Sequence, residues 1–157
     1  MPLLLVRHGH AGRRSAYEGD DRMRPLSKRG LAQAQTLVPL LRKYRPQRVL
    51  SSPFVRCFET VRPTAEALGL PVESIDELAE GHGAEALRLM ERMEGESAVL
   101  CTHGDVAAEA LDSLAGERSR KEKQSMRLQK GDVWVIQSTG SSLAIVTRIR
   151  PPRSADG

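Results

Sequence analysis

The sequence is poor in aromatic residues and in cysteine, and it has no long apolar run. Only 3% of its 157 residues are aromatic, too few to supply the stacking platforms that nucleic-acid bases need, so no nucleic-acid polymer is expected as a partner. Two cysteines do not make a disulfide framework, which favours a reducing, cytoplasmic location. No stretch of about 18 apolar residues occurs, and the N-terminus lacks the pattern of a signal peptide, so neither a membrane span nor secretion is expected.

Charge is unevenly distributed along the chain, although the formal net charge is only +4. Residues 1–62 hold 13 Lys and Arg against 4 Asp and Glu, residues 63–116 hold 2 against 12, and residues 117–157 hold 9 against 4. A basic surface can therefore form where the two ends of the chain meet, and such a surface favours an anionic ligand. Solvated faces of ordinary elements are the alternative for most of these charges.

Segments with the composition of strands alternate with segments of helical periodicity. Strands are expected at residues 3–6, 48–51, 71–75, 98–102, 133–137 and 143–149, the last two forming a hairpin around 138–142. Helices are expected after the N-cap Ser27, from Val55 to Gly69, over 84–94, and from 105 to about Leu114, while 117–130 is either loop or exposed helix. This alternation implies an α/β domain with a mostly parallel sheet over residues 1–150, followed by a flexible tail at 151–157.

The apolar spacing also predicts which helix faces are buried. The first helix is expected to bury Leu31, Ala34, Val38 and Leu41, and the second Val55, Phe58, Ala65 and Leu68. Pro39 is expected to kink the first helix or to end it early, and Pro63 to kink the second, because proline removes a backbone hydrogen bond and its ring clashes with the preceding turn.

Three of the predicted strands end in chargeable side chains. The first ends in the sequence RHGH at 7–10, the second leads into SSPFVR at 51–56, and the fourth into THGD at 102–105. In open α/β sheets ligands bind beyond the carboxyl ends of the strands. Because burying a cation is costly unless an anion meets it, the sequence predicts an anion-binding site where these three strand ends converge.

The motifs at these strand ends resemble those of the histidine phosphatase (phosphoglycerate mutase-like) superfamily. The triplet RHG, the stretch SSPFVRCFET and the triplet THG occur in the family's order and at approximately its spacing, and the likeness extends over nearly the whole chain. It implies a three-layer α/β/α sandwich. The stretches EGDDRMRPLSKRGLAQAQ and KGDVWVIQ are similar to the short SixA-type phosphohistidine phosphatases and to the C-terminal domain of bacterial fusions with a Nudix hydrolase. Since no Nudix segment is present, a stand-alone version is expected.

The resemblance implies a covalent mechanism that needs neither a metal nor another cofactor. His8 would attack phosphorus through a neutral ring nitrogen and form a phosphohistidine that water hydrolyses, and its other nitrogen needs a fixed acceptor, most simply a backbone carbonyl. Arg7 and Arg56 would clamp the phosphoryl oxygens. His103 would add a donor or a positive charge in the transition state.

The general acid and the further substrate contacts are less specific in the sequence. Glu80 best matches the family's acidic position, with Glu77 second, but the Gly-Trp-rich sequence usual after this acid in mutases is absent, and a solvated loop residue is the alternative. SixA-type members are thought to act without a conventional acid there. Gly9 and Arg14 are predicted to contact the substrate. The remaining candidates at the rim, each with solvent exposure as its alternative, are His10, Arg13 and His82.

Other site chemistries fit the residues less well. A two-metal phosphoesterase needs clustered ligands, for which the chain offers His8, His10, His103, Asp20 and Asp105. Their order does not resemble such enzymes, and Arg7 would repel the ions. A cysteine phosphatase needs Cys-x5-Arg, but Pro63 and Ala107 occupy the arginine positions. A non-catalytic phosphate-binding module is a third alternative, against which the presence of both His8 and His103 argues.

The substrate is predicted from the lack of room for insertions. Members that act on small metabolites carry long insertions that wall in the substrate, whereas the widest candidates here are residues 11–25 and 115–130. An open pocket suits a phosphorylated protein side chain, above all phosphohistidine, and a small-molecule or nucleotide phosphoester is the alternative. A monomer or weak dimer is expected.

Overall fold

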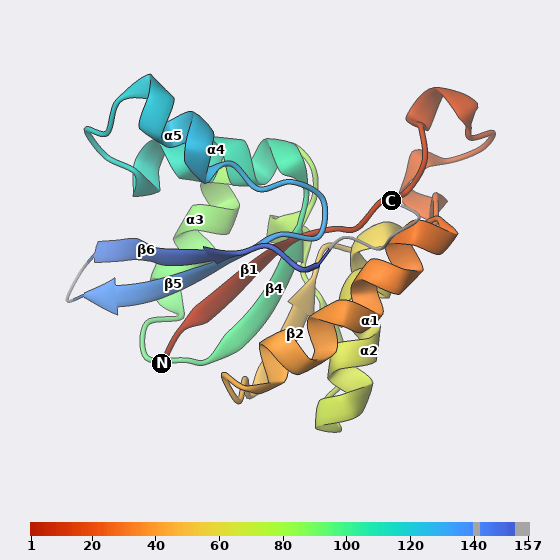
Figure 1. Ribbon diagram of the computed structural model, residues 1–157, viewed down its shortest axis with the longest axis horizontal. Helices are drawn as coiled ribbons and strands as arrows, with labels where there is room; N and C mark the ends of the chain where they lie inside the picture. Colours follow the sequence, from red (N-terminus) through yellow and green to blue (C-terminus); the bar gives the residue numbers. More distant parts are fainter. Residues whose placement is uncertain (140–141, 153–157) are drawn as a thin grey trace.

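The computed structural model describes residues 1–139 and 142–152, and a six-stranded sheet lies at its centre (Figure 1). The strands are β1 (Leu3–Arg7), β2 (Arg48–Ser51), β3 (Val72–Ser74), β4 (Ala98–Thr102), β5 (Val133–Thr139) and β6 (Ser142–Ile149). Their order is β3-β2-β4-β1-β5-β6. The pairs from β3 to β1 are parallel, while β5 is antiparallel to both β1 and β6. The predicted mostly parallel sheet is thus confirmed.

Helices cover both faces of this sheet and complete the predicted three-layer sandwich. They are α1 (Lys28–Arg42), α2 (Val55–Leu68), α3 (Gly83–Arg92), α4 (Gly104–Leu114) and α5 (Arg120–Met126), with short 3-10 turns at Arg14–Ala16, Asp21–Met23 and Asp76–Leu78. Figure 1 shows α1 and α2 on one face and α3, α4 and α5 on the other. In the part of the chain that the structure describes, no helix has the length and hydropathy of a membrane span.

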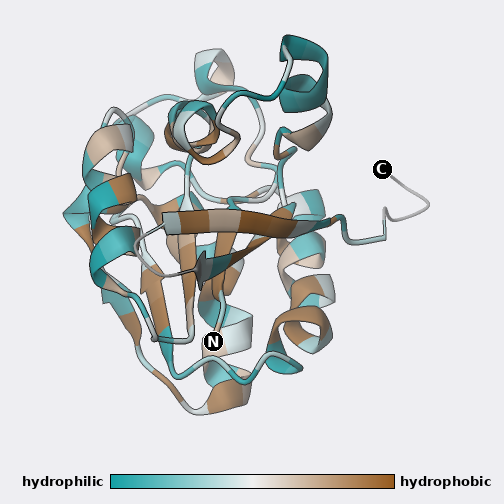
Figure 2. Cartoon of the chain, turned by 90° about the vertical axis from the view of Figure 1, so that its left-hand side faces the viewer, coloured by the Kyte–Doolittle hydropathy of each residue, from teal (hydrophilic) through white to brown (hydrophobic). Residues whose placement is uncertain are grey.

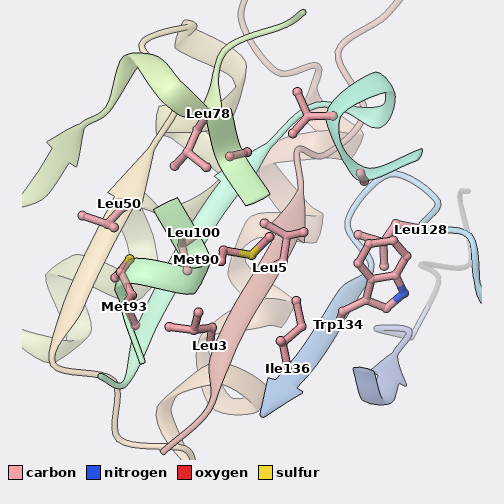
Figure 3. Packing of buried hydrophobic residues seen from close by; sticks show 14 of the residues in the cluster. Leu3, Leu5, Leu50, Leu78, Met90, Met93, Leu100, Leu128, Trp134 and Ile136 are labelled. Carbon is pink, nitrogen blue, oxygen red and sulfur yellow. The ribbon is translucent and has the colours of Figure 1, made fainter. Parts of the chain in front are cut away.

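Alternating side chains of each strand enter two separate hydrophobic cores. Leu3 and Leu5 of β1 pack with residues of α3 and α4 and with Trp134 of β5 (Figure 3). Leu4 and Val6 point to the other face, into a core shared with α1 and α2. Because helices cover both faces of the sheet, the central strands are continuous apolar segments in the sequence. Figure 2 shows these strands coloured as hydrophobic, whereas the helices carry hydrophilic faces outward.

Most helix boundaries agree with the predictions. The Ser27 side chain accepts a hydrogen bond from the Gly30 amide and begins α1, and Gly69, in the left-handed conformation with φ 69°, ends α2. Residues 117–130 contain the short exposed helix α5. Residues 140–141 of the hairpin predicted around 138–142, and residues 153–157 of the predicted flexible tail 151–157, lie outside the described residues.

Two predictions about the helix faces are wrong. Leu31 is 45% exposed, because at 100° per residue it lies about 90° from the centre of the buried stripe of the helix. That stripe consists of Ala34, Leu37 and Leu41. Phe58 is 37% exposed as well, and α2 instead buries Cys57, Val61 and Ala65.

Proline does not end α1 early, as the sequence predicted it could. The helix continues past Pro39 to Arg42, and α2 likewise continues past Pro63 to Leu68. In α1 the last turn carries Leu41, which is fully buried in the core shared with α2. Burial of a leucine side chain stabilises by about 1.5–3 kcal/mol, comparable to the cost of about 3 kcal/mol for proline inside a helix.

Candidate active site

The carboxyl ends of β1, β4 and β2 lie next to one another, so the three predicted motifs meet at one edge of the sheet. A cavity of about 1030 Å3 opens there. Arg7 and His8 reach it from the end of β1, Arg56 from the first turn of α2, and His103 from the N-cap of α4. Residues separated by almost 100 positions in the sequence thus line a single cavity.

His8 lines this cavity and is held in one tautomer. Its Nδ1 lies 2.8 Å from the carbonyl oxygen of Gly9, and because a carbonyl only accepts, Nδ1 carries the proton and Nε2 keeps its lone pair. Burial lowers the pKa of His8 to about 3, electrostatic repulsion from His103, Arg56 and Arg7 acts in the same direction, and the hydrogen bond to Gly9 opposes them. The ring is therefore a neutral base with one free nitrogen at physiological pH.

Arg7 is fixed beside His8 by the backbone around it. Its Nη1 donates to the carbonyl of Leu128 at 2.9 Å, and burial lowers its pKa against the attraction of Asp132 and Asp105. The guanidinium also passes close over Gly104, where a Cβ atom would lie only 2.7 Å from Cζ of Arg7. The glycine that follows His103 therefore leaves room for the arginine that precedes His8.

Arg56 is fully buried and held by two carboxylates. Its Nη2 donates to Glu80 Oε1 at 2.6 Å and to Asp21 Oδ2 at 3.1 Å, and its Nη1 donates to the Asp21 carbonyl at 2.8 Å. The guanidinium carbon lies 4.9 Å from the centroid of the Phe54 ring. A buried guanidinium with acidic partners and a planar fork of donors suits the oxygens of a phosphoryl group.

His103 is packed between two rings. Phe54 meets it edge-on at 4.6 Å between centroids and His8 at 5.4 Å. Its Nε2 lies 2.8 Å from Ser52 Oγ. Among the residues that the structure describes, its buried Nδ1 has no hydrogen-bond partner, although Glu80 Oε1 lies 3.5 Å away, so the hydrogen-bonding capacity of this nitrogen is unused.

Glu80 lies at the opening of the cavity, and Glu77 does not. Both carboxylate oxygens of Glu80 accept from Arg14 Nη2, at 2.8 and 3.1 Å, and Oε1 accepts from Arg56 as well. Glu77 instead pairs with Arg92 at 3.0 Å. Of the two acids considered from the sequence, only Glu80 contacts the residues of the cavity.

The other predicted contacts divide between the cavity and its support. Arg13 and Arg14 line the cavity. Gly9 does not, because its amide donates to Thr60 Oγ1 at 3.0 Å and its carbonyl meets the His8 ring, so it supports His8 instead of forming the cavity wall. His82 caps α3. His10 faces a second, smaller cavity, of about 350 Å3, with Nδ1 2.7 Å from Ser27 Oγ.

Gly30 explains the close packing of α1 against the loop after β1. A Cβ atom at this position would lie 2.0 Å from the carbonyl oxygen of His10, which no backbone tolerates. The same loop receives the Gln33 side chain, whose Oε1 accepts the His10 amide at 2.7 Å. Helix α1 thereby fixes the segment that carries His8.

Sequence reasoning missed two residues that hold the site together. Asp21 accepts from Arg56 and from Arg24, at 3.1 and 2.9 Å, and contacts Arg14 at 3.3 Å. Arg24 is nearly buried and donates to the carbonyl of Ala11 at 2.6 Å. Both lie in the stretch EGDDRMRPLSKRG, and the likeness of this stretch to SixA-type proteins was the only signal in the sequence that could have pointed to them. No spacing rule connects Asp21 to Arg56, which lies 35 positions later.

The residues considered for a two-metal site are not arranged as one. Among residues 1–139 and 142–152, no group of three or more His, Cys, Asp or Glu is placed to hold a metal ion. Asp20 instead caps a 3-10 turn and pairs with Arg22, and Asp105 accepts from the Gly81 amide at 2.8 Å.

The depressed pKa of His8 predicts a specific loss of stability in acid. An unfolded histidine takes up its proton near pH 6.5, whereas folded His8 does so only near 3, so below pH 6.5 protonation favours the unfolded chain. We expect wild type to lose about 2 kcal/mol more of its free energy of unfolding than His8→Asn between pH 7 and pH 5. Urea denaturation of both proteins at the two pH values measures this, and an identical pH dependence of the two would contradict the assignment.

Comparison with known proteins agrees with this geometry. Residues 3–86 match the family model of the histidine phosphatase superfamily (branch 1). An 8-oxo-(d)GTP phosphatase of Mycolicibacterium smegmatis is 36% identical over 157 residues, covering 96% of this chain and 48% of that protein. The chain therefore spans about half the length of this curated relative.

Solved structures show the same fold. A protein from Agrobacterium tumefaciens, provisionally named as the phosphohistidine phosphatase SixA, superposes with a TM-score of 0.80 at 24% identity, over 96% of this chain and 97% of that chain. The protein histidine phosphatase SixA complexed with tungstate gives a TM-score of 0.75 at 22% identity, with the same coverage of both chains. The chain belongs to branch 1 of the histidine phosphatase superfamily.

Proposed function

We propose that this chain is a phosphatase that transfers the phosphoryl group of its substrate first to His8 and then to water. The lone pair of His8 Nε2 attacks phosphorus, and the bond to the leaving group breaks with its electron pair. Water then attacks the same phosphorus, the P–N bond returns its electrons to Nε2, and inorganic phosphate leaves. The observation that carries this proposal is the 2.8 Å contact of Nδ1 with the Gly9 carbonyl, which leaves Nε2 as a free nucleophile.

The surrounding cations fit the charge that develops in this reaction. Arg7 and Arg56 line the cavity together with His8 and offer planar donors to the phosphoryl oxygens. His103 Nδ1, which has no hydrogen-bond partner within residues 1–139 and 142–152, is available to donate to a third oxygen. In phosphoryl transfer, where the protein mainly positions groups and stabilises charge, these three residues supply the main electrostatic contribution.

We propose phosphohistidine in a protein as the substrate, because of the environment of Glu80. This carboxylate accepts hydrogen bonds from Arg14 and Arg56, and an acceptor engaged by two guanidinium groups is at most an auxiliary acid. The imidazole of a phosphohistidine is a good leaving group that needs little help from an acid, whereas the alkoxide of a sugar phosphate needs a positioned one. The wide, open cavity also admits a side chain presented by another protein.

Replacement of Glu80 by glutamine tests this substrate class. With a phosphohistidine protein we expect kcat/KM to fall by less than about 3-fold, and with an alkyl phosphate by about 100-fold, the contribution of a general acid. Steady-state kinetics of wild type and Glu80→Gln on both substrates decides the matter. An equally severe loss on both would make Glu80 an obligatory acid, and failure of the wild type to act on phosphohistidine would exclude the preferred substrate.

A nucleotide is the second candidate, favoured by the curated relative and by the cations of the cavity wall. The relative is named as an 8-oxo-(d)GTP phosphatase, and cations beyond those around His8 line the cavity, among them Arg13, Arg127 and Lys130. Burial and neighbouring arginines, Arg7 first among them, lower the pKa of Lys130, as expected where positive charge is in excess. Nucleoside mono-, di- and triphosphates assayed beside the phosphohistidine protein separate the two candidates.

A further inference from the structure

Ser52 forms the closest polar contact of the His103 ring, and nothing in the mechanism above uses it. It follows β2, it is fully buried, and its amide donates to the carbonyl of Cys101 on β4 at 3.0 Å. Its Oγ lies 2.8 Å from His103 Nε2. The serine is therefore fixed by the sheet directly behind the ring, on the side away from Glu80.

The other contacts of Ser52 settle the direction of this hydrogen bond. Its Oγ accepts the amide proton of Phe54 at 3.3 Å. No further partner of the hydroxyl is present among the described residues, so its one proton is satisfied only by the lone pair of His103 Nε2. Leaving a buried donor unpaired costs about 1–3 kcal/mol, which favours the arrangement in which the serine donates.

A neutral His103 that accepts at Nε2 must carry its proton on Nδ1. This is the ring nitrogen for which the described part of the chain offers no hydrogen-bond partner, and it lies 3.5 Å from Glu80 Oε1. We propose that Ser52 is a positioning residue for the phosphoryl transfer: it keeps the proton of His103 on Nδ1 and turns that nitrogen toward the phosphoryl group. The proposal rests on the function proposed for His8. Ser52 would fix the tautomer of His103 as the Gly9 carbonyl fixes that of His8, except that Ser52 donates its hydrogen bond whereas the carbonyl accepts one.

Cys57 is the competing partner of the same nitrogen. Its Sγ lies 3.5 Å from His103 Nε2, against 2.8 Å for the serine oxygen. A thiol is a weaker donor than a hydroxyl, so the shorter contact to oxygen decides the tautomer. Replacing Cys57 by alanine is accordingly expected to leave the His103 tautomer unchanged.

The tautomer can be measured in the resting wild-type enzyme without any substrate. Nitrogen-15 NMR of the imidazole rings, assigned with His103→Ala, is expected to show the neutral His103 ring protonated at Nδ1 and unprotonated at Nε2. A ring protonated at Nε2 would overturn the proposal. This measurement does not depend on turnover, so it distinguishes a wrong assignment of Ser52 from a failure of the phosphohistidine mechanism, which is tested separately by phosphate on His8.

Kinetics of matched serine variants provide the second test. Ser52→Ala is expected to lower kcat by about 10- to 100-fold with KM changed less than about 2-fold, the effect of losing an orienting partner. Ser51→Ala is the control, because Ser51 is equally buried and its hydroxyl donates at 2.8 Å to the Ser52 carbonyl, not to His103. Its kcat is expected to stay within about 2-fold of wild type.

Combination with His103→Ala separates positioning from a general loss of structure. If Ser52 acts only through His103, Ser52→Ala has no further effect on kcat in the His103→Ala background. Independent, multiplying losses, or a kcat of Ser52→Ala no lower than that of Ser51→Ala, would refute the proposal. Should Ser52→Ala fail to fold, the wild-type NMR spectrum still decides.

Discussion

Replacing His8 by alanine is expected to lower kcat by at least about 10^4-fold, because it removes the atom to which phosphorus becomes bonded. The residual cavity would still hold Arg7, Arg56 and His103, so substrate binding is expected to survive with KM changed by less than about 10-fold. Loss of kcat with retained KM distinguishes a nucleophile from a residue that only binds. Initial rates over a range of substrate concentrations measure both.

Rapid quenching of a turnover reaction shows whether the intermediate forms. Wild type is expected to carry phosphate on His8 that is stable in base and labile in acid, and His8→Ala to carry none. His10→Ala is the matched control, because that ring lies two residues away and faces Ser27 and the second cavity. Its phosphoenzyme is expected to form at a rate within a few-fold of wild type. Loss of activity in EDTA, restored by added metal, would show that the mechanism is not the one proposed.

The sheet and the convergence of its strand ends could be predicted because both depend on local sequence. A buried parallel strand needs apolar residues on both faces, as in Leu3 to Val6, and polar residues directly after such a strand mark the ligand edge. That a backbone carbonyl would fix the tautomer of His8 was predictable for the same reason. Its acceptor proved to be the carbonyl of the next residue, Gly9, which needs no distant partner.

The features that could not be predicted depend on long-range packing. Asp21 reaches Arg56 only because the loop 11–25 folds back over the start of α2, and nothing in the sequence around Asp21 encodes this contact. The exposed positions of Leu31 and Phe58 have a similar origin. Apolar residues were available on more than one face of each helix, and packing against the sheet selected one of them.

The uneven charge distribution has a structural counterpart in the cavity. Its arginines and lysine come from the two basic segments, 1–62 and 117–157, while Glu80 and Asp105 come from the acidic middle. The surface where the basic ends meet is therefore the cavity itself. Glu80 bridges Arg14 and Arg56 in the free protein, and a phosphoryl group entering the cavity would compete with this carboxylate for the same donors.

Arg56→Ala and His103→Ala are each expected to lower kcat/KM by about 100-fold or more, the cost of removing one preorganised donor from a transition state. For Arg56 the expectation rests on complete burial and on its contact with Glu80 at 2.6 Å, which aims the guanidinium into the cavity. Arg56→Lys is expected to recover only part of the loss, because an ammonium keeps the charge but not the planar pair of donors.

The control for Arg56 lies on the same helix. Arg62 of α2 is 61% exposed and pairs with Glu66 one turn further along, so Arg62→Ala removes the same side chain from α2 without touching the cavity. Its kcat/KM is expected to equal that of wild type, and circular dichroism is expected to show all variants folded. Since Arg56 and His103 reach the cavity from different strand ends, near-normal turnover in either alanine variant would mean that the convergence of those ends does not form the catalytic site.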